Sequence, residues 1–158
     1  MSTANDATDS DPFQLLRFVA AQDAVHPQAM QELKAGRKRS HWMWFIFPQL
    51  QGLGTSEMAH RYAISGLPEA HAYLTHPLLG PRLVECTRIV NGLHGSSALQ
   101  IFGHPDDLKF RSSLTLFELV ADNRSDFSTA LEKYFAGQRD PATLQRLQVP
   151  GAQSNTQQ

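Results

Sequence analysis

Apolar side chains recur every three or four residues along most of this chain, and no segment alternates apolar and polar residues for the length of a strand. One such stripe consists of Leu79, Leu83, Cys86, Val90 and Leu93, and another of Phe127, Ala130, Leu131, Tyr134 and Phe135. This spacing places the side chains of a stripe on one face of a helix. The pattern predicts an all-α fold, a single compact domain of about seven to nine helices joined by short loops.

The expected helix positions follow from these stripes and from capping residues. Asp11 and Pro12 suit the cap and first turn of a helix whose apolar face starts with Phe13 and Leu16. Further helices are expected at about residues 56–65, 68–75, 77–92, 105–122, 125–136 and 141–147.

Three His-Pro pairs stand before segments with helical spacing: His26-Pro27, His76-Pro77 and His104-Pro105. Proline fits the first turn of a helix, because its missing N–H has no intrahelical partner there. A catalytic trio of histidines is the alternative, but the capping logic favours helix punctuation. We therefore expect a helix to start at each pair.

The length of 158 residues predicts one domain. Residues 12–147 hold the apolar pattern, whereas 1–11 and 148–158 have none and are expected to be disordered tails. The first residues resemble neither a signal peptide nor a transit peptide. The strongest apolar stretch, 42–47, is too short to cross a bilayer. These features predict a cytoplasmic protein that does not contact a membrane.

Composition excludes several kinds of site. Fourteen basic and fifteen acidic side chains give a net charge of -1, which argues against nucleic-acid binding. The single cysteine, Cys86, cannot form an intramolecular disulfide or a cysteine-rich zinc site. Glu57 and His60 form one Glu-x-x-His spacing, whereas a helical di-metal site needs two. We expect neither a metal nor a cofactor, and the oligomeric state is left open.

The densest chemistry lies between residues 36 and 50. Cations, a serine, a histidine and aromatic side chains follow one another there: Arg37, Lys38, Arg39, Ser40, His41, Trp42, Trp44, Phe45 and Phe47. The cations could hold a phosphate while a tryptophan stacks on a ring. In the structural alternative the aromatics fill the core and the cations offset the dipole of the preceding helix. Adjacent Trp42, Met43 and Trp44 fit that alternative less well, because a helix cannot turn all three to one face.

A second candidate segment is the helix expected at 105–122. Asp106, Lys109 and Ser113 share one face of it. Lys109 could activate Ser113, as in a serine–lysine dyad, or bind an anion. The structural alternative is a surface pair of Asp106 and Lys109. The residues favour anion binding over nucleophilic catalysis. The glycine-rich turn at 52–54 could likewise receive a phosphate, although a turn capped by Thr55 or Ser56 is the simpler interpretation.

Residues 40–54, with the sequence SHWMWFIFPQLQGLG, resemble the signature of the 1810 family of domains of unknown function. AYLTHPLLGPRL at 72–83 and IFGHPDDLKFRSSLTLF at 101–117 resemble two further family blocks in the same order. The resemblance implies a small, mostly helical bacterial protein without an established activity. Some members carry a "calpastatin" label, which denotes a disordered inhibitor and conflicts with this periodic, aromatic sequence. The resemblance supplies no catalytic residues.

These features favour a protein that binds or processes an anionic, nucleotide-like molecule, such as a derivative of ADP-ribose or NAD. The expected ligand contacts are Arg37, Lys38, Arg39, Ser40, Trp42, Trp44, Lys109 and Ser113. His41 is the acid–base candidate, because imidazole titrates near neutrality, and Glu118 or Asp107 is its candidate carboxylate partner. In the structural alternative His41 is a packing residue that donates a hydrogen bond to a backbone carbonyl. We expect the pocket where segment 37–47 meets the helix carrying Lys109. The alternative is a non-catalytic module that binds another protein through an aromatic surface, and whether the chain is an enzyme is left open.

Overall fold

The computed structural model describes residues 11–148, and this part of the chain forms nine helices and no strand. The helices are α2 (Leu16–Lys34), α3 (Met43–Ile46), α4 (Glu57–Arg61), α5 (Leu67–Thr75), α6 (Leu79–Asn91), α7 (Ala98–Phe102), α8 (Asp106–Glu118), α9 (Asp126–Phe135) and α10 (Pro141–Arg146). The all-α prediction is therefore confirmed. Apart from Asp11 and Gln148, the tails expected at 1–11 and 148–158 lie outside the described residues.

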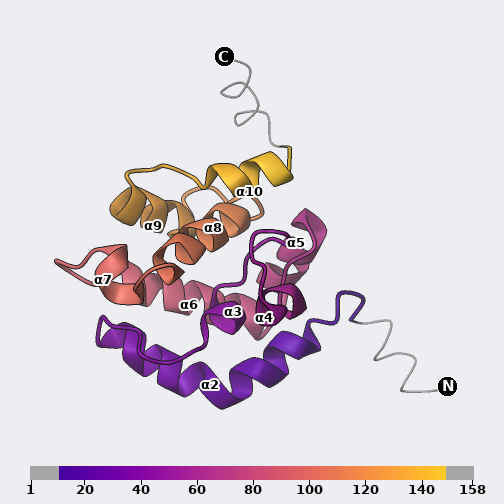
Figure 1. The fold of residues 1–158 in the computed structure, drawn as a ribbon, viewed down its shortest axis with the longest axis horizontal. Helices are drawn as coiled ribbons and strands as arrows, with labels where there is room; N and C mark the ends of the chain where they lie inside the picture. The colour runs from indigo at the N-terminus through magenta and orange to yellow at the C-terminus, as the bar shows by residue number, and fades with distance from the viewer. Residues whose placement is uncertain (1–10, 149–158) are drawn as a thin grey trace.

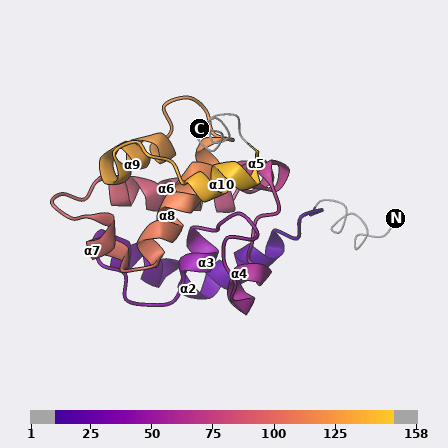
Figure 2. The same cartoon turned by 45° about the horizontal axis from the view of Figure 1, so that its top comes forward.

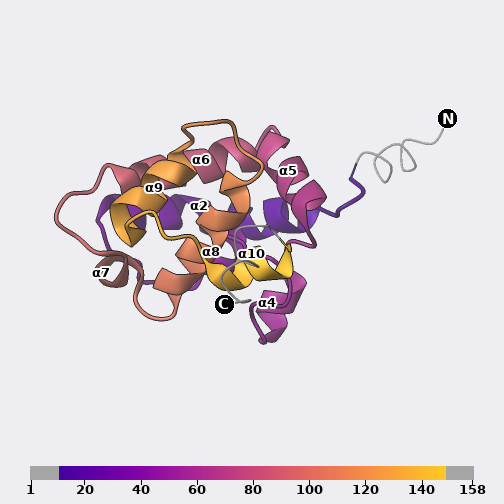
Figure 3. The same cartoon turned by 90° about the horizontal axis from the view of Figure 1, so that it is seen from above.

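Two helices, α6 and α8, form the centre of the domain. Figure 1 shows α2 along one edge of the molecule and α9 and α10 along the opposite edge. After a 45° turn, in Figure 2, α2 still lies along the lower edge, and α10 is seen over the middle of the molecule beside α8. α6 packs against α2, α5 and α9, and α8 packs against α7, α9 and α10. Seen from above in Figure 3, α10 lies across α8. The core thus lies around α6 and α8.

The apolar stripes predicted for α6 and α9 face this core. Leu79, Leu83, Cys86 and Val90 are buried on α6, and Phe127, Ala130 and Leu131 are buried on α9. α8 differs, because Phe110 and every residue from 112 to 117 are buried. A helix buried on most of its circumference is enclosed by neighbours rather than laid on a surface. α8 therefore fixes the position of the elements around it.

Two of the three His-Pro pairs stand at helix starts as expected. His76 precedes α6, and its Nδ1 accepts hydrogen bonds from the N–H groups of Leu78 and Leu79 at 3.1 and 3.2 Å. His104-Pro105 precedes α8. The prediction for His26-Pro27 is wrong, because Pro27 lies inside α2. Pro27 is exposed, so water can satisfy the carbonyl that loses its helical partner. Figure 1 shows that α2 curves, as helices that contain proline do.

α2 also begins later than expected. The Asp11 carboxylate caps this start by accepting the N–H groups of Leu15 and Leu16 at 2.7 and 3.0 Å. This geometry turns Leu15 and Phe18 into the core and leaves Leu16 67% exposed. The prediction that Leu16 lies on the apolar face is therefore wrong, because Leu15 and Phe18 face the core in its place.

Two short helices have no counterpart among the predicted ones. α3 is a single turn within the run of aromatic residues, and both Met43 and Ile46 are buried on it. The core surrounds α3, so adjacent side chains can be buried on different faces. α7 begins with a capping box, in which Ser97 and Gln100 exchange hydrogen bonds. The Ser-x-x-Gln spacing of this capping box is visible in the sequence and could have predicted the start of α7.

Substitution of Gly80 by alanine tests the packing of α5 on α6. A Cβ at Gly80 would overlap the carbonyl oxygen of Leu74, and backbone cannot move aside cheaply. We expect Gly80→Ala to lower the free energy of unfolding by about 1–3 kcal/mol or more, as measured by urea denaturation. The control is Gly92→Ala at the end of α6, where a Cβ meets its neighbours at an ordinary 3.5 Å. Equal stability of the two variants would contradict the close helix contact.

Candidate functional site

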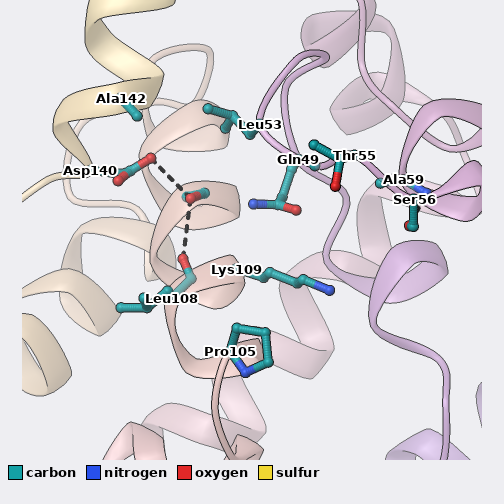
Figure 4. Close-up of a pocket in the computed structure, with 12 residues that line it drawn as sticks. Gln49, Leu53, Thr55, Ser56, Ala59, Pro105, Leu108, Lys109, Asp140 and Ala142 are labelled. Atoms are coloured by element: carbon teal, nitrogen blue, oxygen red, sulfur yellow. Dashed lines mark hydrogen bonds between the residues drawn. The ribbon is translucent and has the colours of Figure 1, made fainter.

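A cavity of about 400 Å³ lies between α8, the loop that follows α3, and α10. Figure 4 shows its two sides, with α8 and α10 on one and the loop and α4 on the other. Its apolar walls are Leu53, Pro105, Leu108 and Ala142. Its polar groups include Gln49, Thr55, Lys109, Ser112 and Asp140. Concave sites of this kind, apolar with a few convergent polar groups, are where proteins bind small molecules.

The loop wall of the cavity is held from two directions. The carbonyl of Gln49 accepts the N–H of Ile64 at 2.9 Å, and the N–H of Gln51 donates to the carbonyl of Ile64 at 2.8 Å. From the other side, Arg146 of α10 donates from Nε to the carbonyl of Gln51 at 3.0 Å. Gly52 has a φ of +90°, and a Cβ there would overlap the Arg146 guanidinium. The loop is therefore a fixed wall.

The glycine-rich segment has the simpler of its two predicted roles. Ser56 is the N-cap of α4 and accepts the N–H of Ala59 at 3.1 Å. Gly54 and Thr55, which precede this cap, line the cavity together with Ser56. The turn thus ends the loop and contributes to its wall.

Lys109 is the cation on the opposite wall. Its Nζ lies 5.5 Å from the centroid of the Trp44 ring and 3.5 Å from Oδ1 of Asp106. The other oxygen of Asp106 lies 2.9 Å from Nζ of Lys38, whose side chain is only 8% exposed. Lys38 in turn lies over the Trp42 ring, at 5.2 Å from its centroid. Two ammonium groups therefore share one carboxylate, and the closer, more buried pair is the one with Lys38. The uncompensated positive charge lies at Lys109.

A second, much smaller cavity adjoins the first. It has a volume of about 10 Å³ and is lined by Trp44, Gln49, Ala59 and Lys109 among others. This volume holds about one water molecule and no ring. Lys109 also covers one face of the half-buried Trp44 indole. The Trp44 ring therefore packs against Lys109, and the face in this contact is not free to stack on a ligand.

The far wall of the cavity holds a carboxylate that is already engaged. Asp140 caps α10, accepting the N–H of Thr143 at 3.1 Å. The Ser112 hydroxyl lies 2.9 Å from Oδ2 of Asp140 and 3.1 Å from the carbonyl oxygen of Leu108, as the dashed lines in Figure 4 show. Ser112 and Asp140 therefore tie α10 to α8.

The basic segment at 37–42 is organised by a different group, the carboxylate of Glu32 near the end of α2. Glu32 is 7% exposed and accepts hydrogen bonds from Trp42 Nε1 at 2.9 Å and from Ser40 Oγ at 2.6 Å. It also accepts the N–H groups of Arg39 and Ser40 at 2.7 and 3.0 Å. Burial alone would raise the pKa of Glu32, but these hydrogen bonds outweigh burial and lower the pKa to about 2.

This arrangement separates most of the predicted ligand contacts from the cavity at Lys109. Arg37 and Arg39 line another cavity beside α2, and Ser40 donates to Glu32. Trp42 is fully buried. Among the ligand contacts expected from the sequence, the structure brings Trp44 and Lys109 together, and it joins Lys38 to Lys109 through Asp106.

The predicted catalytic residues are placed apart from this cavity. His41 is exposed, and neither His41 nor Glu118 lines the cavity at Lys109. The Glu118 carboxylate accepts two hydrogen bonds from Arg139, both at 2.6 Å, and one from Ser128 at 2.7 Å. Partial burial raises the pKa of Glu118, but the hydrogen bonds from Arg139 and Ser128 prevail and lower it. Its carboxylate is thus occupied by neighbours on the chain.

Ser113 is 1% exposed, and its Oγ has no hydrogen-bond partner within residues 11–148. The neighbouring Ser112 lines the cavity instead. Sequence reasoning also missed Gln49 and Asp140. Asp140-Pro141 was readable as a helix start, but not as part of a cavity wall.

Two further properties concern the described part of the chain as a whole. Between residues 11 and 148, no three His, Cys, Asp or Glu side chains are grouped so that they could hold a metal ion. None of the helices in this range combines the length and the apolar character needed to cross a membrane.

Comparison with known proteins gives a family and a fold. The family model described as "Protein of unknown function (DUF1810)" matches residues 12–147. The crystal structure of the conserved hypothetical protein Rv1873 from Mycobacterium tuberculosis is similar, with a TM-score of 0.86 and 57% sequence identity. The match covers 88% of this chain and 99% of that one. No curated protein matches the chain.

The Glu32 carboxylate predicts a specific pH dependence of stability. Its lowered pKa means that folding favours the ionised form, so its contribution is fully present above the ordinary value of 4.5 and is lost as the pH falls toward about 2. We expect Glu32→Gln to lower the free energy of unfolding at neutral pH by on the order of 3 kcal/mol. The difference from the wild type should shrink as the pH falls below 4.5.

Urea unfolding at several pH values between about 7 and 3 measures this difference. The control is Glu85→Gln, because Glu85 is exposed on α6 and forms no ion pair with any residue from 11 to 148. A Glu32→Gln effect that stays constant with pH would show that the ionised carboxylate is not the stabilising form.

Proposed function

We propose that this chain, which belongs to the DUF1810 family of proteins of unknown function, binds a small anionic molecule that carries a ring. The site is the cavity between α8, the loop after α3 and α10. The observation that carries the proposal is the Lys109 ammonium on the cavity wall, because within residues 11–148 its one carboxylate partner, Asp106, is shared with Lys38.

The charge balance supports a ligand with one anionic group. Lys38 and Lys109 together face one carboxylate, Asp106, which leaves one net positive charge. An ammonium has three N–H donors, so Lys109 can contact Asp106 and still donate to a ligand. The carboxylate on the far wall, Asp140, is taken up by the first turn of α10 and by Ser112. A monophosphate or a carboxylate matches this site better than the diphosphates of ADP-ribose or NAD do.

The walls support a ring beside that anionic group. A volume of about 400 Å³ lies within the usual range for small-molecule sites, about 300–1,000 Å³. Leu53, Pro105 and Leu108 supply apolar surface to it. Leu108 is among the exposed leucines of the domain, and covering it with a ring would remove apolar surface from water. A nucleoside monophosphate combines such a ring with one anionic group.

The alternative of an interaction module with an aromatic surface has less support. Trp42, Phe45 and Phe47 are at most 9% exposed, so these side chains offer no surface to a partner.

Replacement of Lys109 by methionine tests the proposal. Methionine keeps an unbranched chain over Trp44 but removes the charge. We expect AMP at about 100 times its dissociation constant to stabilise the wild type by roughly 2.7 kcal/mol, or about 5–10 °C in Tm. Lys109→Met should lose most of this shift in a thermal denaturation assay, and NAD and ADP-ribose should shift the wild type less than AMP does.

Two control variants decide where the ligand binds. Lys34→Met removes an exposed cation at the end of α2, away from the cavity lining, and should leave the shift unchanged. Arg39→Ala removes a cation that lines the other cavity. Loss of the shift in Arg39→Ala but not in Lys109→Met would place the ligand beside α2 and overturn the proposed site.

A further inference from the structure

We infer that the carboxamide of Gln49 selects the ligand, and that the ligand is a nucleobase-like nitrogen heterocycle joined to a single anionic group. This inference rests on the proposed function, because the cavity that holds the anionic group on Lys109 must also hold the ring.

Gln49 and Lys109 face the same space from opposite sides. Only Gln49, Lys109 and Ala59 line both the large cavity and the small one beside Trp44. In Figure 4 the Gln49 side chain extends from the loop toward α8, and Lys109 extends from α8 toward the loop. A ligand held by the ammonium therefore lies beside the carboxamide.

The Gln49 carboxamide is not engaged by the protein. Within the described chain, neither Oε1 nor Nε2 of Gln49 has a hydrogen-bond partner, although the residue is half-buried. Three other glutamines of the domain have structural roles, whereas Gln31, Gln51 and Gln145, like Gln49, form no side-chain hydrogen bond within residues 11–148; of these four, Gln49 alone lines the cavity. Gln22 bonds Phe45 and Tyr73 in the core, Gln28 bonds Glu32 and Ser40, and Gln100 completes the capping box of α7. Gln49 thus keeps its hydrogen-bonding capacity for a partner in the cavity.

The backbone that carries Gln49 is held in place. The carbonyl of Gln49 accepts the N–H of Ile64, and the N–H of Gln51 donates to the carbonyl of Ile64. Pro48, which is buried, precedes it. Binding therefore orders one side chain and no backbone, which limits the entropic cost of recognition.

The chemistry of a carboxamide defines the complementary ligand. It presents an acceptor oxygen and a donor NH₂ side by side in one plane. A phosphate or carboxylate offers only acceptors and would leave Oε1 facing negative charge. The edge of a nucleobase offers a donor and an acceptor at matching spacing, as in the bidentate pairing of glutamine with N6 and N7 of adenine. Leu53 and Leu108 supply the apolar contacts that a flat ring requires.

The test compares a complete nucleotide with its ring-free part. Dissociation constants of AMP and ribose 5-phosphate are measured by isothermal titration calorimetry for the full chain. We expect the wild type to bind AMP about tenfold or more tightly than ribose 5-phosphate, the scale of a bidentate contact. Gln49→Met should weaken AMP binding about tenfold and leave ribose 5-phosphate unchanged. Gln51→Met, the same change at an exposed neighbour outside the cavity lining, should alter neither value.

The possible outcomes separate this inference from the proposed function. Equal affinity of the wild type for AMP and ribose 5-phosphate, or equal weakening of both by Gln49→Met, would overturn the role of Gln49 and leave the anion site standing. Absence of binding of either probe to the wild type would overturn the proposed function and this inference with it. If Gln49→Met fails to fold, Gln49→Asn keeps a carboxamide but shortens its reach, and it should weaken AMP selectively.

Discussion

A buried carboxylate that has no cationic partner within residues 11–148 determines how the chain leaves α2. Glu32 is held by hydrogen bonds from the backbone and side chains of residues 39–42, which satisfy a charge that would otherwise be costly to bury. One of these hydrogen bonds holds the Trp42 indole in the core, and Trp42 is the residue that precedes α3. Pro48 and Gln49 follow α3 closely, so the position of α3 also sets where the loop wall of the cavity begins.

The fold could be predicted where a helix buries a single face. α6 and α9 are of this kind, and their stripes are readable because burial and period coincide. Prediction failed where tertiary structure prevails over local pattern. α3 is enclosed by the core and shows no stripe, Pro27 is tolerated because its side of α2 faces water, and Leu15 rather than Leu16 packs into the core at the start of α2.

The candidate site could be predicted only in part, for related reasons. The pair of Asp106 and Lys109 follows from helix spacing. The contact of Lys109 with Trp44 was expected only because both segments carry residue types suited to an anionic, ring-bearing ligand. Which serine faces the cavity does not follow. Ser112 and Ser113 differ by about 100° of helix rotation, and α8 is buried on so many sides that its sequence marks no outward face. The convergence of Gln49, Lys109 and Asp140 depends on loops and crossing angles that no local pattern encodes.

The hydrogen bond from Arg146 to the carbonyl of Gln51 joins residues 95 positions apart. During synthesis, the loop that supplies Gln49 and α8, which supplies Lys109, are made before α10. Until then the loop lacks one of its two supports and the cavity lacks the wall formed by Asp140 and Ala142. The cavity is therefore completed only when α10, the last of the described helices, packs on α8.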